Sequence, residues 1–194
     1  MHHYFTIYKP YLVLSQFTSA DGKITLADHF DIPKNVYPVG RLDYDSEGLL
    51  VLTDDTQLNN RLLNPKHKHE REYWVQVEGT ATSDAIVKLQ KGVIISIDGK
   101  PYKTAACKAR LFDDDPIVPK RNPPIRFRKN IPSSWISLTL TEGKNRQVRK
   151  MTAQVGFPTL RLIRNRVEKI VLGDMQPGDI LEWSRDSMYA SLFG

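Results

Sequence analysis

The residues best suited to chemistry are the acids of residues 40–55, GRLDYDSEGLLVLTDD. Asp43, Asp45 and Glu47 occupy alternate positions, and Gly48 and Asp54 follow them. This spacing is close to that of a calcium-binding loop, which has alternating acids in its first half, a glycine at its centre and an acid at its end. The same carboxylates would also suit acid–base or nucleophilic chemistry, or the support of a turn.

The neighbouring sequence argues against the calcium interpretation. A helix must lead into such a loop, but Pro38 and Gly40 disfavour a helix there. The last ligand of such a loop is a bidentate glutamate, whereas Asp54 is shorter and stands where a helix cap is needed. Residues 49–53, LLVLT, are typical of a buried strand and not of a ligand-bearing turn. We therefore predict no calcium site.

Other patterns for metal binding or nucleophilic catalysis are weaker still. His67 and His69 alternate in a charged loop, which is more typical of solvated surface than of a metal site. Cys107 is the single cysteine, which excludes an internal disulfide and a cysteine-based zinc site. The sequence contains no HExxH, CxxC, phosphate-binding glycine loop or GxSxG motif. Zinc or serine-triad hydrolysis and nucleotide-dependent phosphoryl transfer therefore have no support.

Charge is distributed unevenly along the 194 residues, whose net charge is +6. Residues 120–169 contain 13 basic and 2 acidic residues, so this segment carries +11 while the remainder carries −5. Such a segment suggests a polyanionic partner, with nucleic acid as the first choice, because arginine suits phosphates and stacks on bases. A solvated basic face is the alternative.

Signals for export or membrane insertion are not evident. No apolar run reaches the ~18 residues that a membrane-spanning helix needs. The start, MHHYFTIYKP, lacks the basic, apolar and cleavage regions of a signal peptide. We therefore expect a cytoplasmic protein.

The pattern of apolar and turn-forming residues predicts an α+β fold on a mixed or antiparallel sheet. Residues 119–134 are rich in proline and are expected to form a loop. Asp54 or Asp55 is expected to cap a helix. Residues 4–10 and 11–18 are β-rich runs broken by Pro10, and they are expected to form a strand followed by a turn. Further expected strands are 49–52, 71–79, 93–99, 102–112, 135–143 and 159–170. Expected helices are 56–65, 82–92 and 144–156, with a short helical turn at 25–30.

Residues 40–55 resemble the motif around the catalytic aspartate of the RsuA-type pseudouridine synthases, G-R-L-D-x-D-[ST]-[ED]-G-L-L. Three other segments resemble motifs of this family in the same order. YKPYLVLSQF (8–17) looks like its lysine–proline motif, and LTEGKNRQVRKM (140–151) matches its E-G-[KR]-N-R-Q-[VI]-R-[RK]-M block. REYWVQVEG (71–79) is similar to its K-x-Y-x-V segment, although Arg71 stands where lysine is usual. The resemblance covers roughly residues 4–185.

The proline- and arginine-rich residues 119–135 narrow the resemblance to the E-type (RluE-like) enzymes of large-subunit ribosomal RNA, which lack an S4 domain. The resemblance implies a single catalytic domain over residues 1–194, with a mixed, mainly antiparallel sheet, flanking helices and two halves around a basic cleft. It implies an isomerase that breaks the C1′–N1 bond of one uridine, turns the uracil and rejoins it through C5. It also implies a monomer that needs no cofactor or metal and acts on large-subunit ribosomal RNA, free or in an assembly intermediate.

The resemblance assigns catalytic roles to Asp43, Tyr73 and Arg149. Asp43 matches the catalytic aspartate, which either attacks C1′ as a nucleophile or removes the 2′ proton as a base. Arg149 matches the arginine that pairs with this aspartate and keeps it ionised, with phosphate binding as the alternative. Tyr73 matches the tyrosine whose ring packs on the target base, and a core tyrosine is its alternative. If Tyr73 faces the base, strand alternation places Trp74 on the opposite side, in the core.

Further residues are assigned to substrate binding and to loop support. Leu162 falls where the family has an apolar residue lining the uracil pocket, with an ordinary core leucine as the alternative. Asp45 and Glu47 are expected to salt-bridge Arg41 or hold the loop of Asp43. The target uridine must be flipped out of its helix, at a cost that a basic face offsets. The expected substrate-binding residues, phosphate contacts included, are Arg41, Leu162, Lys144, Arg146, Lys150, Arg161, Arg164, Arg126 and Arg128.

Two other functions remain as alternatives. One is a non-catalytic RNA-binding or ribosome assembly factor that retains the fold, against which the joint presence of Asp43, Tyr73 and Arg149 argues. The other is a metal-dependent enzyme that uses Asp43, Asp45 and Asp54, which addition of a chelator separates from the isomerase.

Overall fold

The computed structural model of the protein describes residues 2–19, 21–125 and 131–194. The chain forms two compact units, the first from Met1–His69 and Ile163–Gly194 and the second from Glu70–Leu162. Within the described ranges, no helix is long and apolar enough to cross a membrane.

The first unit is built on a mixed sheet whose strands are β1 (Tyr4–Lys9), β2 (Tyr37–Pro38), β3 (Glu47–Thr53), β9 (Thr159–Val167), β10 (Ile170–Val171) and β11 (Ile180–Glu182). β9 belongs to this unit from Ile163 onwards, and its residues 159–162 belong to the second unit. The strand order is β11, β1, β3, β9, and only β3 and β9 run parallel to each other. β2 pairs with β3, and β10 with β9. Every residue of β3 is buried, as the predicted apolar run 49–52 requires.

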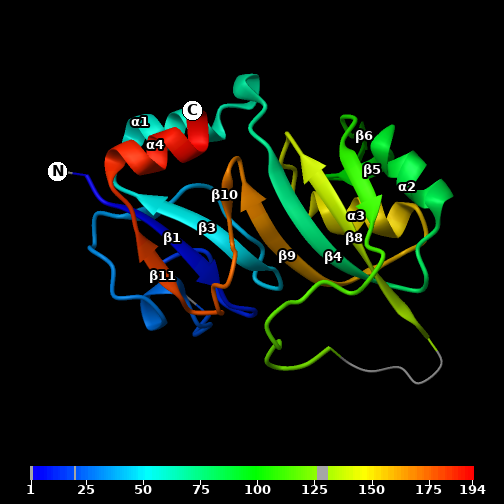
Figure 1. Cartoon of the computed structure of the whole chain (residues 1–194), viewed down its shortest axis with the longest axis horizontal. Coiled ribbons are helices and arrows are strands. Elements are labelled where there is room, and N and C mark those ends of the chain that lie inside the picture. The colour runs from blue at the N-terminus through cyan, green and yellow to red at the C-terminus, as the bar shows by residue number, and fades with distance from the viewer. Residues whose placement is uncertain (1, 20, 126–130) are drawn as a thin grey trace. The chain divides into compact units, whose positions relative to one another are not determined.

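Two α-helices and two short 3-10 helices complete the first unit: α1 (Thr56–Leu63), α4 (Arg185–Phe193), η1 (Leu26–Asp28) and η2 (Pro65–His67). The carboxylate of Asp55 accepts hydrogen bonds from the backbone N–H groups of Gln57 (2.9 Å) and Leu58 (3.2 Å), so Asp55 is the cap of α1. α1 and α4 lie side by side (Figure 1), and the Arg61 guanidinium stands 3.8 Å from the ring centroid of Phe193.

Helix α4 was not predicted from the sequence. Ser184 caps it by accepting a hydrogen bond from the Ser187 N–H, and the hydroxyl of Tyr189 donates to Asp55 at 2.8 Å. Only Met188 and Leu192 of its nine residues are buried. A helix this short with two buried positions gives no recognisable helical period.

Residues 11–18 form a turn and an irregular segment after β1, which agrees with the turn expected after Pro10. Leu12 adopts a left-handed φ of 59°, and Leu14 forms only an isolated bridge with Thr25. The apolar residues of the segment are used in packing: Val13 lies in a core cluster with Ile7 and Leu50.

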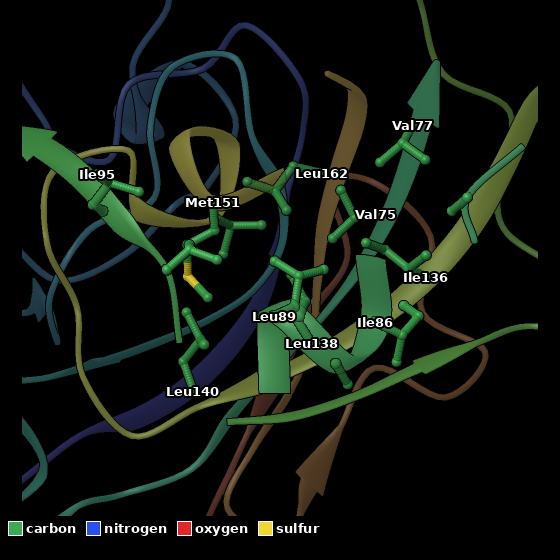
Figure 2. Packing of buried hydrophobic residues seen from close by; sticks show 14 residues of the cluster. Val75, Val77, Ile86, Leu89, Ile95, Ile136, Leu138, Leu140, Met151 and Leu162 are labelled. Atoms are coloured by element: carbon green, nitrogen blue, oxygen red, sulfur yellow. The ribbon is translucent and has the colours of Figure 1, made fainter. Parts of the chain in front are cut away.

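The second unit contains an antiparallel sheet in the order β4, β8, β7, formed by β4 (Arg71–Glu78), β8 (Ser133–Leu140) and β7 (Lys108–Leu111). A separate hairpin joins β5 (Ile94–Ile97) to β6 (Lys100–Lys103). The helices are α2 (Ser83–Gln90) and α3 (Gln147–Gln154). Side chains from these elements form one buried cluster that includes Val75, Leu89, Leu138 and Met151 (Figure 2).

Helix α3 begins three residues later than predicted. Arg146, immediately before it, has a left-handed φ of 52°, so residues 144–146 form a turn that presents the start of the helix. The predicted fold class is confirmed: the protein is α+β, with a mixed and mainly antiparallel sheet and flanking helices.

Candidate functional site

In the first unit, Asp43 is half-buried on a turn that backbone contacts hold in place. The Ser46 N–H donates to the Asp43 carbonyl at 3.0 Å. The Ser15 hydroxyl donates to the Leu42 carbonyl (2.8 Å) and accepts from the Leu42 N–H (3.0 Å). Because both backbone groups of Leu42 are bound, the turn presents the Asp43 carboxylate from a defined position.

Glycine is required where this turn enters β3. Gly48 has φ +113°, a conformation that side chains rarely adopt. It pairs with Arg164 of the parallel strand β9, and a Cβ atom at Gly48 would lie 2.7 Å from the Arg164 nitrogen and closer still to its oxygen. Gly40, before the turn, also has positive φ (+73°), so glycines with this backbone conformation stand on either side of Asp43.

The lysine of the lysine–proline motif, Lys9, was given no role from the sequence, and it is buried close to the turn. Lys9 is 0% exposed, and its ammonium donates to the carbonyls of Pro10 (2.8 Å) and Val13 (2.7 Å). Burial lowers the pKa of Lys9 to about 7, and the carboxylates of Glu47, Asp45 and Asp43 oppose part of that shift. No periodicity distinguishes this lysine from a surface one.

The other acids of the opening motif have structural partners. Glu47 is buried as the first residue of β3 and accepts a hydrogen bond from the Tyr8 hydroxyl at 3.1 Å. Asp54, beyond the last residue of β3, accepts hydrogen bonds from the His3 N–H and the Asn35 amide, both at 2.7 Å. The calcium-like spacing therefore spans a turn and a strand and not one ligand loop.

Metal-binding groups do not gather elsewhere in the described part of the chain: residues 2–19, 21–125 and 131–194 contain no cluster of three or more His, Cys, Asp or Glu placed to hold an ion. His69 Nδ1 lies 2.8 Å from Glu168, and its ring contacts that of Phe193. Burial raises the pKa of the Cys107 thiol to about 11, which keeps it protonated and unreactive at neutral pH.

In the second unit, Tyr73 lies on β4 on the same face as Val75 and Val77. It is half-buried and packs against the hydrophobic cluster. Trp74 points to the opposite face, where its indole N–H donates to Glu72 at 3.0 Å and its ring contacts Phe112 edge-on. Trp74 is therefore outside the core clusters, and the expectation that it lies in the core is wrong, because in this unit the helices cover the Tyr73 face.

The loop before α3 and the first turn of that helix carry four of the predicted cations of this unit. Lys144 and Arg146 are exposed, whereas Lys150 and Arg149, both on α3, are half-buried. The Lys144 N–H donates to the side chain of buried Gln147 at 2.9 Å, which fixes the loop to the helix.

The remaining predicted substrate contacts differ in accessibility. Arg41 is exposed, while Leu162 is buried within the cluster of the second unit (Figure 2). Arg161 and Arg164 are each only 5% exposed, and they donate to the carbonyls of Pro119 (2.8 Å) and Leu49 (2.7 Å). This burial argues against direct phosphate contact by either. Arg126 and Arg128 lie outside the described residues.

A carboxylate on a fixed turn and a separate loop of exposed cations are elements that an RNA-modifying enzyme needs. The family model for RNA pseudouridylate synthase matches residues 3–154, and the chain belongs to this family. Asp43 lies in the first unit and Tyr73 and Arg149 in the second. The pairing of Asp43 with Arg149 stays a prediction, as does the basic cleft.

Curated relatives support the same family. The chain is 47% identical over 184 residues to ribosomal large subunit pseudouridine synthase E of Xanthomonas campestris pv. campestris, covering 94% of each chain. It is 52% identical over 170 residues to the protein of that name from Vibrio parahaemolyticus, covering 88% of this chain and 69% of the other. A crystal structure of a pseudouridylate synthase has a TM-score of 0.80 and 26% identity, covering 99% of this chain and 74% of that one. The predicted family resemblance is confirmed.

Proposed function

We propose that this protein isomerises a uridine of large-subunit ribosomal RNA to pseudouridine. The observation that carries the proposal is the match to the Xanthomonas campestris enzyme, which extends over 94% of both chains and is named for that activity and that RNA. A match over so much of both chains includes every segment that we assign a role.

The reaction is an isomerisation that conserves every atom. The C1′–N1 bond breaks, the uracil turns, and a new bond forms between C1′ and C5. The proton on C5 is lost and N1 gains one, so nothing is oxidised or reduced and no co-reactant is consumed. The protein has to supply a group that acts on the sugar, a surface that holds the detached base, and cations that hold the RNA.

Asp43 is the group that acts on the sugar. Its half-buried carboxylate is presented by a turn whose backbone is bound on both sides. Two routes use it: attack on C1′ gives a covalent sugar ester, and removal of the 2′ proton gives a glycal. RNA with deuterium at C2′ of uridine separates them, because a primary isotope effect on the chemical step arises only in the second route.

Tyr73 and Arg149 complete the proposed catalytic set. The ring of Tyr73, half-buried at the edge of the cluster, packs on the uracil, and Arg149 keeps the aspartate ionised. Lys144, Arg146 and Lys150 hold phosphates while the uridine is flipped out. From the proposed substrate we infer that the protein works in the cytoplasm, and from the family resemblance that it is a monomer.

The test is primer extension through carbodiimide-modified ribosomal RNA from a strain that lacks this protein. We expect one pseudouridine stop to disappear, to return with the wild-type protein or with Asp31→Asn, and to stay absent with Asp43→Asn. Asp31→Asn is the matched control because it makes the same change at an exposed acid of the same unit that has no assigned role. A stop that persists without the protein would refute the enzyme and favour an RNA-binding assembly factor. A stop restored by Asp43→Asn would remove Asp43 from the chemistry.

A further inference from the structure

One carboxylate in the second unit joins the β5–β6 hairpin to the basic loop before α3. Glu142 accepts hydrogen bonds from the Tyr102 hydroxyl (2.6 Å) and the Ala105 N–H (2.9 Å). It also accepts one from the side-chain amide of Gln147 at 2.6 Å. Two donors from the end of the hairpin and one from α3 hold the hairpin and the loop together as one surface. β5 also packs against α3, which adds a second attachment (Figure 1).

The same tyrosine places a cation without neutralising it. The Lys144 ammonium lies 5.1 Å from the centroid of the Tyr102 ring. A cation–π contact orients an ammonium while its full charge remains available to an anion. Because Lys144 is exposed, its charge faces solvent where a phosphate can approach.

A second cation lies on the same face of the hairpin. Lys100 precedes Tyr102 by two positions on β6, and alternation along a strand places both side chains on one face. Lys100 is exposed, and no carboxylate of the described residues lies within ion-pair distance of it or of Lys144. The one acid of residues 94–103 is Asp98 in the turn, whereas Lys103 points to the other face of β6 by the same alternation and donates to the Gly92 carbonyl. The charge of this surface is therefore complementary to a polyanion.

We propose that Lys100 contacts the phosphate backbone of the RNA substrate together with Lys144, and that Tyr102 and Glu142 are the positioning residues of this surface. The inference rests on the proposed function, since it takes RNA as the ligand. Sequence reasoning did not find Lys100 because it lies outside the cationic segment 120–169 and reaches that segment only through the fold.

The test measures binding of the full chain to a large-subunit ribosomal RNA transcript over a range of salt concentrations. Loss of one phosphate contact should lower the slope of log K against log salt by about one, and raise Kd severalfold at low salt. We expect this of Lys100→Gln. Lys88→Gln, which removes an exposed lysine of the same unit from helix α2, is the matched control and should leave the slope unchanged. Equal slopes for the two variants would overturn the proposal.

The positioning role has its own readout. Tyr102→Phe keeps the ring and removes the bond to Glu142, whereas Tyr102→Leu removes both. We expect Tyr102→Leu to raise KM more than it lowers kcat, and Lys144→Gln to have little further effect on RNA binding in that background. Full additivity of Tyr102→Leu and Lys144→Gln would contradict a positioning role, because independent residues add.

Failure of this inference differs from failure of the proposed function. If the wild-type protein forms pseudouridine but Lys100→Gln binds RNA with the same salt dependence as the wild type, only the proposed role of Lys100 is refuted. If the slope falls but the wild-type protein forms no pseudouridine, the RNA-binding surface stands and the proposed reaction is refuted. Urea unfolding of each variant confirms that the compared proteins are folded.

Discussion

Replacement of Gly48 by alanine tests whether the entry to β3 is as constrained as its geometry indicates. The residue has φ +113°, and holding a side chain in that region costs about 1 to 3 kcal/mol. The added methyl would lie 2.7 Å from the backbone nitrogen of Arg164, well inside the ~3.5 Å of a normal contact. Backbone atoms of a paired strand cannot rotate away, so relief requires displacement of β9, at about 1 to 3 kcal/mol.

The two effects together predict that Gly48→Ala loses about 2 to 6 kcal/mol of unfolding free energy, a large share of the ~5 to 15 kcal/mol of a typical domain. Urea unfolding followed by circular dichroism measures this loss. Gly22→Ala is the matched control, since Gly22 also has positive φ (+64°) but a Cβ there would meet no atom within 4 Å. We expect the control to lose about 1 kcal/mol.

The reasoning is refuted if Gly48→Ala and Gly22→Ala lose the same amount, because the clash with Arg164 would then contribute nothing. The rate of pseudouridine formation, measured at urea concentrations below the midpoint of unfolding, is a second test. The turn that carries Asp43 leads directly into Gly48, so displacement of Gly48 and its partner Arg164 should lower the activity of Gly48→Ala. Gly22→Ala should keep the wild-type activity.

Three further predictions concern charge, helix docking and metals. Burial lowers the pKa of Lys9 to about 7 from 10.5, so between these values the unfolded chain holds a proton that the folded chain has released, and stability rises with pH. The unfolding free energy of the wild type, measured relative to that of Lys9→Met by urea unfolding, should therefore increase by up to about 1.4 kcal/mol per pH unit in that window. If the unfolding free energies of the two proteins change with pH by the same amount, the prediction is contradicted. Tyr189→Phe removes the hydrogen bond from α4 to Asp55 and should cost about 1 to 2 kcal/mol in urea unfolding, whereas Tyr37→Phe, at a residue 62% exposed, should cost nothing measurable. Excess chelator should leave the rate of pseudouridine formation unchanged, and complete loss of activity would revive a metal-dependent mechanism.

Much of the architecture follows from sequence patterns that each extend over only a few residues. The apolar run 49–52 predicted a buried strand, and β3 is buried throughout. An aspartate before residues 56–65 predicted a capped helix, and Asp55 binds two N–H groups of α1. These features depend on local periodicity and capping, which need no knowledge of distant residues. The motifs likewise identified the family, because they are contiguous stretches.

The sequence by itself thus determined most strands and helices, the family, and the candidate residues of the site. Only the tertiary structure decided which charged side chains are accessible. Arg161, Arg164 and Lys9 have the same side-chain chemistry as exposed cations, yet each is buried and bound to backbone carbonyls. Conversely, Lys100 joins the basic surface of the α3 loop only because Tyr102 meets Glu142, 40 residues further along the chain. Burial and partnership are properties of contacts between segments far apart in sequence, and no local pattern encodes them.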